Sequence, residues 1–184
     1  MNTRAMTVPS HGASQTGNSE ISIADQDGAA LQLISFAIGG DQYGVDIMAV
    51  REIKGWTDIT PLPGQSEYVR GVLNLRGAIV PIVDLRCRFG QGLTKASPLH
   101  IVIIVQIAEK AIGLLADRVL DIVSLDEAEI KPVPRVAQSG RAGFLSGLIT
   151  TEAGMIALID LPNLLAGHLG EESKDLDAAK SVAA

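Results

Sequence analysis

Residues 71–86 read GVLNLRGAIVPIVDLR, and a degraded copy of this stretch, GLITTEAGMIALIDL, occupies residues 147–161. The spacing from the first glycine to the aspartate is 13 residues in both copies. Apolar residues recur at almost every matching position, whereas Asn74, Arg76 and Pro81 occur only in the first copy. The repeat therefore separates residues that build the fold from residues that are candidates for function.

The repeat extends upstream of these two stretches. YGV at residues 43–45 matches IGL at 112–114, and V-x-E-I at 50–53 matches V-x-D-I at 119–122. Two more matches follow in the same order, the Pro-x-Pro segments at 59–63 and 130–134 and the aromatic residues Tyr68 and Phe144. The offset between copies grows from 69 to 76 residues, as expected where loops have taken insertions. A period of this length exceeds that of solenoid repeats and predicts two copies of one small domain.

Composition narrows the classes of function. The chain has 184 residues, a net charge of −6 and 47% hydrophobic residues with six aromatics, which is typical of a compact core built of Val, Ile, Leu and Ala. No sustained basic surface is present, so nucleic-acid binding is not expected. Cys87 is the only cysteine, which rules out an intramolecular disulfide and favours a reducing compartment. Arg86 and Arg88 flank this thiol and could lower its pKa, but a small apolar filler is the preferred interpretation.

The two ends of the chain differ from its middle. Residues 1–30 and 168–184 are rich in polar and small residues without periodicity, and are expected to form disordered or mobile tails. Neither the N-terminus nor any other stretch has the apolar length of a signal peptide or membrane span. The sequence therefore predicts a cytoplasmic protein without direct membrane insertion.

Many short alternating strands lie between the tails, and few helices are indicated. The strands expected from this pattern cover residues 31–38, 42–46, 68–75, 78–84, 101–107, 111–115, 144–150 and 155–161. An all-β fold of two small barrels in tandem follows, with barrel 1 at about residues 31–95 and barrel 2 at about 96–161. A short C-terminal helix is expected to begin near Pro162. The sequence leaves open whether the barrels exchange strands.

The sequence contains no recognisable motif for catalysis or for binding a metal or cofactor. The three histidines lack metal-ligand spacing, and no phosphate-binding loop or nucleophile elbow is present, so no catalytic residue, metal site or cofactor is predicted. Asp84 and Asp160 end equivalent strands and are interpreted as acceptors of backbone N–H groups. Asp117 and Asp121, on either side of Arg118, predict a solvated face.

The first copy also carries a family resemblance. The segments YGVDI at residues 43–47, V-R-E-I at 50–53 and RGVLNLRGAIVPIVDLR at 70–86 closely resemble CheW, the bacterial chemotaxis coupling protein. The resemblance covers about residues 31–167. It implies two SH3-like five-stranded β-barrels and a non-catalytic adaptor between chemoreceptor (methyl-accepting chemotaxis protein) cytoplasmic tips and the histidine kinase CheA, within membrane-associated signalling arrays.

The resemblance also implies where the partners bind. The receptor tip is expected in a groove bordered by Val50, Glu52, Ile53, Gly71, Asn74, Arg76 and Gly77. The kinase is expected to pair barrel against barrel through its regulatory domain, and its contact is expected at the apolar edge formed by Tyr43, Val45 and Ile47. From the residues themselves we expect Glu52 and Arg76 to face each other as a charged pair, because arginine serves well as an interface anchor.

Two alternative functions remain at this point. The same module could serve a non-flagellar chemosensory pathway, for example one that controls surface motility. A free-standing ligand-binding β protein is a less favoured reading, since the motif residues predict an open groove rather than a closed polar pocket.

Overall fold

Ten strands and two short α-helices carry the repeat in the computed structural model, which describes residues 30–134 and 143–169. In chain order the elements are β1 (Leu31–Ile38), β2 (Asp41–Asp46), the 3-10 turn η1 (Ile47–Ala49), β3 (Val50–Gly55), β4 (Val69–Leu75), β5 (Ala78–Asp84), α1 (Leu85–Arg88), β6 (Ile101–Ile107), β7 (Lys110–Ala116), β8 (Arg118–Leu125), the 3-10 turn η2 (Glu127–Glu129), β9 (Leu145–Thr151), β10 (Gly154–Ile159) and α2 (Leu161–Leu169). All of the expected strands and the C-terminal helix are found within two residues of their predicted ends. Apart from residues 30, 168 and 169, the expected tails lie outside the described residues.

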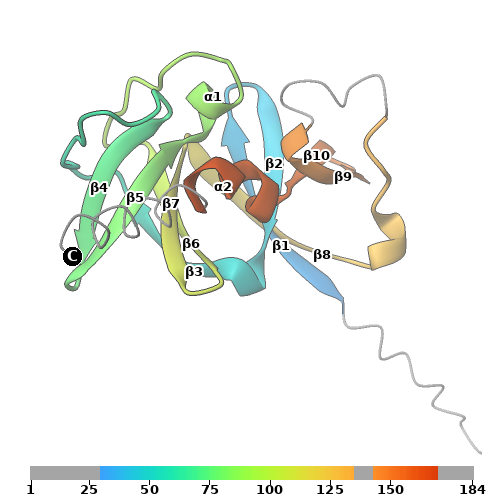
Figure 1. Cartoon of the computed structure of the whole chain (residues 1–184). Helices are drawn as coiled ribbons and strands as arrows, with labels where there is room; N and C mark the ends of the chain where they lie inside the picture. The colour runs from blue at the N-terminus through green and yellow to red at the C-terminus, as the bar shows by residue number, and fades with distance from the viewer. Residues whose placement is uncertain (1–29, 135–142, 170–184) are drawn as a thin grey trace, which may run out of the picture.

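The strands form two five-stranded sheets that lie side by side (Figure 1). One has the order β8-β1-β2-β10-β9 and is called barrel A; the other has the order β3-β6-β7-β5-β4 and is called barrel B. Helix α2 lies across the front of the molecule between them (Figure 1). None of the helices in the described part of the chain is long and apolar enough to cross a membrane.

Each barrel takes a hairpin from one repeat and three strands from the other. The hairpin β1–β2 joins β8, β9 and β10, and the hairpin β6–β7 joins β3, β4 and β5. The boundary expected near residue 95 therefore does not divide the chain between the barrels. The reason lies in the connections: only η1 separates β2 from β3, and only Asp117 separates β7 from β8. Links this short carry the chain across to the neighbouring sheet.

The two barrels repeat each other in the pairing of individual residues. Leu158 of β10 pairs with Gly44 of β2 as Ile82 of β5 pairs with Gly113 of β7, and both contacts are parallel. The Pro-x-Pro segments close each barrel through isolated antiparallel bridges at matching positions, Thr60 to Val72 and Lys131 to Leu148. The duplication inferred from sequence is thus preserved in the hydrogen-bond pattern.

The largest hydrophobic cluster lies between the barrels rather than inside either one. It contains seventeen buried residues from β1, β2, β5, β6, β7, β10, α1, α2 and the residue after α1, against six inside barrel B and four inside barrel A. Strand β6 has the sequence IVIIVQI, which is apolar without alternation because both faces of the strand are buried. Val102 and Ile104 face the interior of barrel B, whereas Ile103 and Val105 face the shared cluster. Because most of the core is shared, we expect the barrels to unfold together.

Arg88 contacts matching aromatic residues of the two repeats. Its guanidinium carbon lies 4.3 Å from the ring centre of Tyr68 and 4.4 Å from that of Phe144, the aromatic residues that match each other in the repeat. Its Nε and one Nη donate to the backbone oxygen of Leu164 in α2, at 3.2 and 3.1 Å. The side chain therefore joins both barrels and the C-terminal helix through cation–π contacts and hydrogen bonds.

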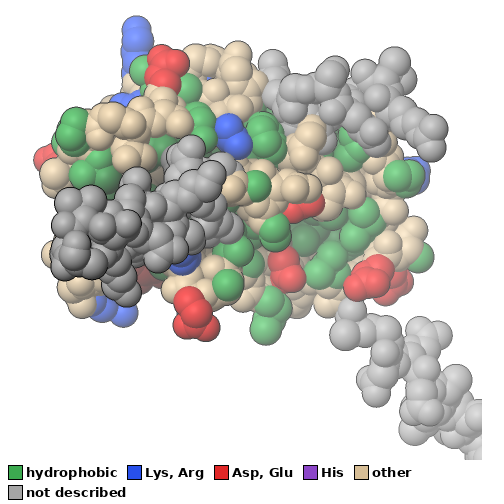
Figure 2. All heavy atoms as spheres, in the orientation of Figure 1, with side chains coloured by type: hydrophobic (Ala, Val, Ile, Leu, Met, Phe, Trp, Pro, Cys, Tyr) green, Lys and Arg blue, Asp and Glu red, His purple; other side chains and the backbone are tan. Residues whose placement is uncertain are grey.

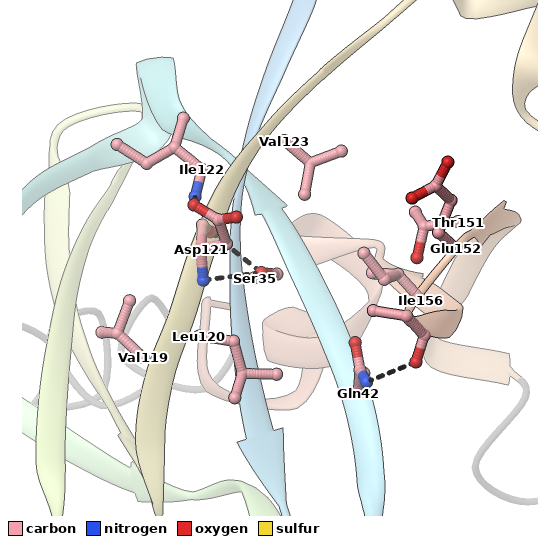
Figure 3. Close-up of a pocket in the computed structure, with 11 residues that line it drawn as sticks. Ser35, Gln42, Val119, Leu120, Asp121, Ile122, Val123, Thr151, Glu152 and Ile156 are labelled. Atoms are coloured by element: carbon pink, nitrogen blue, oxygen red, sulfur yellow. Dashed lines mark hydrogen bonds between the residues drawn. The ribbon is translucent and has the colours of Figure 1, made fainter.

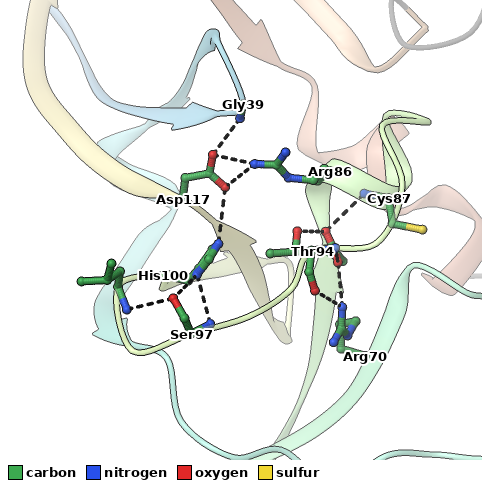
Figure 4. Close-up of polar contacts among 10 residues, drawn as sticks. Gly39, Arg70, Arg86, Cys87, Thr94, Ser97, His100 and Asp117 are labelled. Carbon is green, nitrogen blue, oxygen red and sulfur yellow. Dashed lines mark hydrogen bonds and ion pairs between the residues drawn. The ribbon is translucent and has the colours of Figure 1, made fainter.

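Asp84 and Asp160 hold the starts of α1 and α2, as interpreted from the sequence. Asp84 accepts from the backbone N–H of Cys87 at 3.2 Å, and Asp160 accepts from that of Asn163 at 3.0 Å. Asp84 is fully buried and also binds Thr94 and Arg70, whereas Asp160 is only half-buried. The same aspartate thus acts as a helix cap twice, and in the first copy it also anchors the connection from α1 to β6 (Figure 4).

Asp117 is a structural residue at the junction of the barrels, which corrects the expectation of a solvated face. Its carboxylate accepts from the N–H of Gly39 at 2.7 Å and from Nη2 of Arg86 at 2.9 and 2.8 Å (Figure 4). Nε2 of His100 lies 3.8 Å from the same carboxylate. Gly39 belongs to the β1–β2 turn of barrel A and Arg86 to α1 beside barrel B, so the network ties the two barrels together.

The surroundings of Cys87 keep its thiol protonated rather than activating it. Burial raises the pKa of Cys87, and the negative charges of Glu67 and Asp84 raise it further while Arg70 lowers it. The neighbouring arginines point elsewhere, Arg86 to Asp117 and Arg88 to the aromatic pair. The preferred interpretation of Cys87 as an unreactive filler fits this geometry.

Candidate protein-binding surface

The hairpin β4–β5 presents the residues of the first repeat that have no counterpart in the second. Its two-residue turn consists of Arg76 and Gly77, with φ angles of 50° and 92°. Positive φ at both central positions matches the type I′ turns that fit the twist of a hairpin. The Oδ1 of Asn74 accepts from the N–H of Gly77 at 2.8 Å. Asn74 therefore shapes the turn that projects Arg76, a local role that sequence comparison had not assigned.

Glu52 and Arg76 meet across the seam of barrel B. The Nη2 of Arg76 lies 3.4 Å from the Oε2 of Glu52, as expected for the charged pair inferred from sequence. Glu52 belongs to β3 and Arg76 to the β4–β5 turn, so the pair joins the two outer strands of the sheet. The Arg76 side chain is 90% exposed and that of Glu52 is 31% exposed. Such a pair adds little to stability but leaves Arg76 open to a partner.

Exposed apolar side chains lie on the same strands. Ile53, next to Glu52, is 39% exposed, and Ile79, which pairs with Asn74 across the hairpin, is 63% exposed. Large aliphatic side chains exposed beside an arginine are the usual composition of a protein-binding surface. Ile79 flanks Arg76 in the sequence but is not among the predicted receptor-binding residues, because the alternating strand pattern does not reveal that its face is left uncovered.

The remaining residues of the expected receptor site lie behind this surface. Val50 is half-buried against the shared cluster. Gly71 is buried with φ of 133°, and a Cβ atom there would clash with the carbonyl oxygen of Thr60. Only glycine allows this close approach of two backbones. Gly71 and Val50 therefore support the surface rather than presenting side chains to a partner.

The kinase contact expected at Tyr43, Val45 and Ile47 does not fit the structure. Tyr43 and Val45 are 5% and 1% exposed and belong to the cluster between the barrels, and Ile47 is half-buried against the same cluster. Strand β2, which was taken for an apolar edge, is the central strand of barrel A between β1 and β10. Tyr43 and Val45 therefore have too little free surface to contact another protein directly, and Ile47 exposes only part of its side chain.

Comparison with known proteins places the chain in a family. Residues 32–168 match the family model described as a CheW-like domain. The chain belongs to the CheW family. A chemotaxis protein CheW from Rhizobium meliloti (strain 1021) is 41% identical over 133 residues, which span 72% of this chain and 86% of that protein. A chemotaxis protein CheW from Klebsiella aerogenes is 34% identical over 137 residues, or 74% of this chain and 82% of that protein.

A solved structure supports the family and the fold. The crystal structure of the scaffolding protein TtCheW from Thermoanaerobacter tengcongensis superposes with a TM-score of 0.69 and 34% sequence identity, covering 74% of this chain and 92% of that one. The predicted fold of two SH3-like five-stranded barrels with a short C-terminal helix is confirmed. The family resemblance drawn from residues 43–86 is confirmed as well, and with it the chemotaxis adaptor function.

The chemistry of the surface is that of recognition. Within residues 30–134 and 143–169, no group of three or more His, Cys, Asp or Glu side chains is placed to hold a metal ion. The exposed groups of the β3–β4–β5 surface include a carboxylate, two guanidinium groups, an amide and aliphatic side chains, which can form hydrogen bonds, ion pairs and apolar contacts; they belong to Glu52, Arg51, Arg76, Asn74, Ile53 and Ile79. This is the chemistry that a scaffolding protein requires.

Proposed function

We propose that the chain couples the cytoplasmic tips of chemoreceptors to the histidine kinase CheA, without catalysis and without a cofactor. Its membership of the CheW family supports this function. The chain would act inside the cell, recruited to membrane-associated receptor arrays by its two partners. The kinase would be bound through its regulatory domain, by a surface other than the buried residues of β2.

The receptor tip would bind at the surface of barrel B formed by the β4–β5 turn and β3. Glu52, Ile53, Asn74, Arg76 and Gly77 would form or shape the contact, and Val50 and Gly71 would support it from behind. The pairing of exposed Arg76 with Glu52 is the single observation that carries this assignment. The glutamate holds the arginine side chain in place before binding, which reduces the conformational entropy lost when a partner docks.

A non-flagellar chemosensory pathway is the second candidate. Protein PilI from Pseudomonas aeruginosa is 28% identical over 141 residues, which span 74% of this chain and 76% of that protein. Several relatives named for chemotaxis are more similar, so a chemotaxis array remains the first choice. The genes that neighbour this one, if they encode flagellar or pilus components, would separate the two.

The test is a pull-down with a receptor signalling fragment and CheA, using charge reversals at the pair. The adaptor function requires a ternary complex with the wild-type chain. Glu52→Arg and Arg76→Glu should each weaken capture of the receptor fragment while leaving capture of CheA unchanged. The double variant, which restores opposite charges, should recover part of the receptor binding if the two side chains act as a pair.

Glu109→Arg provides the matched control, because Glu109 is an exposed residue of a hairpin turn in the same barrel. It should bind both partners as the wild type does. Failure of the wild-type chain to bind either protein would refute the adaptor function. Normal receptor binding by both single reversals would refute the assigned surface but not the adaptor function.

A further inference from the structure

Neither repeat forms a complete sheet by itself. Repeat 1 comprises β1–β5 with α1, and repeat 2 comprises β6–β10 with α2. In the described part of the chain, the strands paired within a repeat are β1–β2, β4–β5, β6–β7 and β9–β10. The pairs β1–β8, β2–β10, β3–β6 and β5–β7 all join one repeat to the other. A two-stranded hairpin is marginally stable at best in water, so each repeat needs a complementary repeat in order to fold.

Side chains also bond from one repeat to the other. The hydroxyl of Ser35 in repeat 1 donates to the backbone oxygen of Asp121 in repeat 2 at 2.9 Å and accepts from its N–H at 3.0 Å (Figure 3). Nε2 of Gln42 donates to the backbone oxygen of Ala153 at 3.4 Å in the same view. The shared hydrophobic cluster likewise contains residues of both repeats. None of these contacts requires the two repeats to belong to the same chain.

The linker between the repeats, residues 89–100, is much longer than the gap it closes. Asp84, just before α1, pairs with Leu115, and Leu115 pairs with Val102 near the start of β6. Two strand spacings of about 4.8 Å therefore separate Asp84 from Val102, which is a gap of about 10 Å. The twelve residues from 89 to 100 could span about 40 Å if they were extended. The linker is thus long enough to reach a neighbouring molecule.

Thr94 fixes the first half of the linker to repeat 1. Its backbone N–H and its hydroxyl donate to the carboxylate of Asp84 at 2.8 and 2.7 Å, and its backbone oxygen accepts from Arg70 at 2.8 Å. Thr94 is buried, and both of its partners belong to repeat 1. The linker therefore stays with its own repeat 1 as far as Thr94.

His100 fixes the other end of the linker. Its backbone oxygen accepts from the N–H of Trp56 at 2.9 Å, which continues the pairing of β3 with β6. Residues 95–99, the hinge, lie between these two anchors, and Leu99 is 85% exposed. Trp56 follows β3 of repeat 1, whereas His100 leads into repeat 2. A hinge that takes another course would therefore deliver repeat 2 to the repeat 1 of a second chain.

A swap of whole repeats between two copies would keep nearly all of the contacts of the monomer. Each of the two bodies in the dimer would contain repeat 1 of one chain and repeat 2 of the other, and only the hinge would take a new path. The monomer is favoured in dilute solution, because the linker holds its two repeats at an effective concentration of about 1 mM. Near that protein concentration the same contacts form between chains, which is the usual route to a swapped dimer.

We propose that the chain dimerises with a second copy of itself by swapping whole repeats at the hinge, residues 95–99. Each body of the dimer carries a complete β3–β4–β5 surface, since Glu52 and Arg76 both belong to repeat 1. The swapped dimer is therefore a form of the adaptor with two partner-binding surfaces, a consequence that rests on the proposed function. The swap itself rests only on the strand pairing and on the linker.

A swapped dimer must be distinguished from two copies that associate face to face. Val119, Leu120 and Ile122 of β8 are 36%, 38% and 55% exposed, and Figure 2 shows hydrophobic side chains on the surface of the molecule. Contacts between such side chains would also produce a dimer, but each body would then contain both repeats of one chain. The measurement must therefore report which chains share a body as well as the mass.

The test is a disulfide between the two repeats. Gln32 of β1 pairs with Ser124 of β8, and Nε2 of Gln32 lies 3.4 Å from Oγ of Ser124, so the two side chains share a face of the sheet. Opposite residues of antiparallel strands have Cα atoms about 4.5–5.5 Å apart, a separation that a disulfide can bridge. The variant Gln32→Cys/Ser124→Cys also carries Cys87→Ser, which removes the native thiol. It is refolded from urea at about 5 μM and at about 0.5 mM, and is then oxidised.

Size-exclusion chromatography separates monomer from dimer, and denaturing electrophoresis without reductant then shows which chains are linked. Refolding at the higher concentration should give about threefold more dimer or better. The dimer fraction should run as two linked chains, because each disulfide joins repeat 1 of one chain to repeat 2 of the other. The monomer fraction should run as a single chain. The matched control is Gln106→Cys/Ala111→Cys in the same Cys87→Ser background, a pair within the β6–β7 hairpin that should give single chains from both fractions.

A shorter hinge should shift the chain toward the dimer. Deletion of residues 95–97 removes the turn in which the N–H of His100 donates to the backbone oxygen of Ser97 at 3.0 Å, and it leaves two residues between Thr94 and His100. Short hinges strain the closed form and favour swapping, so the dimer fraction at equal concentration should rise about threefold or more. A dimer fraction that does not rise would refute the assignment of the hinge to residues 95–99.

Two results would overturn the proposal as a whole. One is the absence of any dimer after refolding at about 0.5 mM, both with the full hinge and with the shortened one. The other is a dimer fraction of the Gln32→Cys/Ser124→Cys variant that runs as single chains, which would show face-to-face association instead. No receptor or kinase is present in these experiments, so their failure leaves the proposed adaptor function untouched.

Discussion

The substitution Asp84→Asn tests whether this aspartate contributes more to the free energy of unfolding than Asp160, its counterpart in the second repeat. The carboxylate of Asp84 is fully buried and accepts four hydrogen bonds. Its Oδ2 accepts from Thr94 N at 2.8 Å and Arg70 Nη1 at 3.0 Å; its Oδ1 accepts from Thr94 Oγ1 at 2.7 Å and Cys87 N at 3.2 Å. Asparagine keeps one acceptor oxygen and places an NH₂ group against the donors that faced the other.

The expected cost follows from those lost contacts. In either orientation of the amide two donors lose their acceptor, Thr94 N with the charged Arg70 Nη1 or Cys87 N with the Thr94 hydroxyl, and each such loss typically costs about 1–3 kcal/mol. Arg70 keeps its bond to Thr94 O at 2.8 Å and some solvent contact, which limits the penalty. We expect the free energy of unfolding to fall by about 3 kcal/mol, or the melting temperature by about 6–12 °C.

Asp160→Asn is the matched control in the second repeat. Asp160 accepts only from the backbone and side-chain nitrogens of Asn163, at 3.0 and 2.8 Å. Asparagine caps helices as well as aspartate does, so this variant should lose about 0.5 kcal/mol or less. The difference has a topological cause: the chain continues from α1 to β6 through a connection that Asp84 anchors at Thr94, whereas the contacts of Asp160 within the described residues are confined to the start of α2.

Urea unfolding followed by the fluorescence of Trp56, the only tryptophan, and by circular dichroism gives both free energies. A cycle with Arg70→Ser, which introduces the residue found at the matching position Ser146, measures the coupling. The double variant should be less destabilised than the sum of the single ones. If Asp84→Asn unfolds within about 1 kcal/mol of Asp160→Asn, the buried network does not have the importance assigned to it.

Three further predictions concern the junctions and the thiol. Gly71→Ala should destabilise the protein by about 3 kcal/mol or more, because it combines a positive φ with a backbone clash. Gly147→Ala should cost about 1–2 kcal/mol, since its Cβ meets mainly an isoleucine side chain that can move; equal urea midpoints would contradict this account. Asp117→Asn should lower stability by about 2 kcal/mol without shifting the tryptophan and circular dichroism transitions apart, because the barrels share their core; two separate transitions would show independent barrels. Cys87 should react with iodoacetamide more slowly than free cysteine at neutral pH and approach full reactivity only above the usual thiol pKa, because its raised pKa keeps it protonated; a rate equal to or above that of free cysteine would contradict the raised pKa.

Most of the strands could be read from the sequence because alternation records which side of a strand is buried. The bounds of β1, β5 and β6 follow directly from their apolar patterns and the turns that flank them. Strand β8 was not predicted, because its outward residues include Val119, Leu120 and Ile122 and so obscure the alternation. The repeat contains a partial signal, since V-x-D-I at residues 119–122 of β8 matches V-x-E-I at residues 50–53 of β3.

The candidate site was predictable in part. Glu52 and Arg76 were found because Arg76 is present in one copy only, and their contact follows from their places on outer strands of one barrel. Gly71 was assigned to a binding surface although it serves a close backbone approach, and Tyr43 was assigned to an edge although it lies in the core. Apolar patterns show that a strand is buried on one side but not whether the covering partner is its own chain or another protein.

The sequence by itself determined the duplication, most of the strands, the aspartate caps and the charged residues that distinguish the two copies. Only the tertiary structure decided which barrel each hairpin joins. The hairpins β1–β2 and β6–β7 are equivalent in sequence, so side-chain pattern alone fits either pairing, and the short connections through η1 and Asp117 select the exchanged one. That exchange places the large cluster between the barrels. It also brings Glu52 and Arg76 together as an ion pair on barrel B, whereas the matching positions of barrel A carry two carboxylates, Asp121 and Glu152.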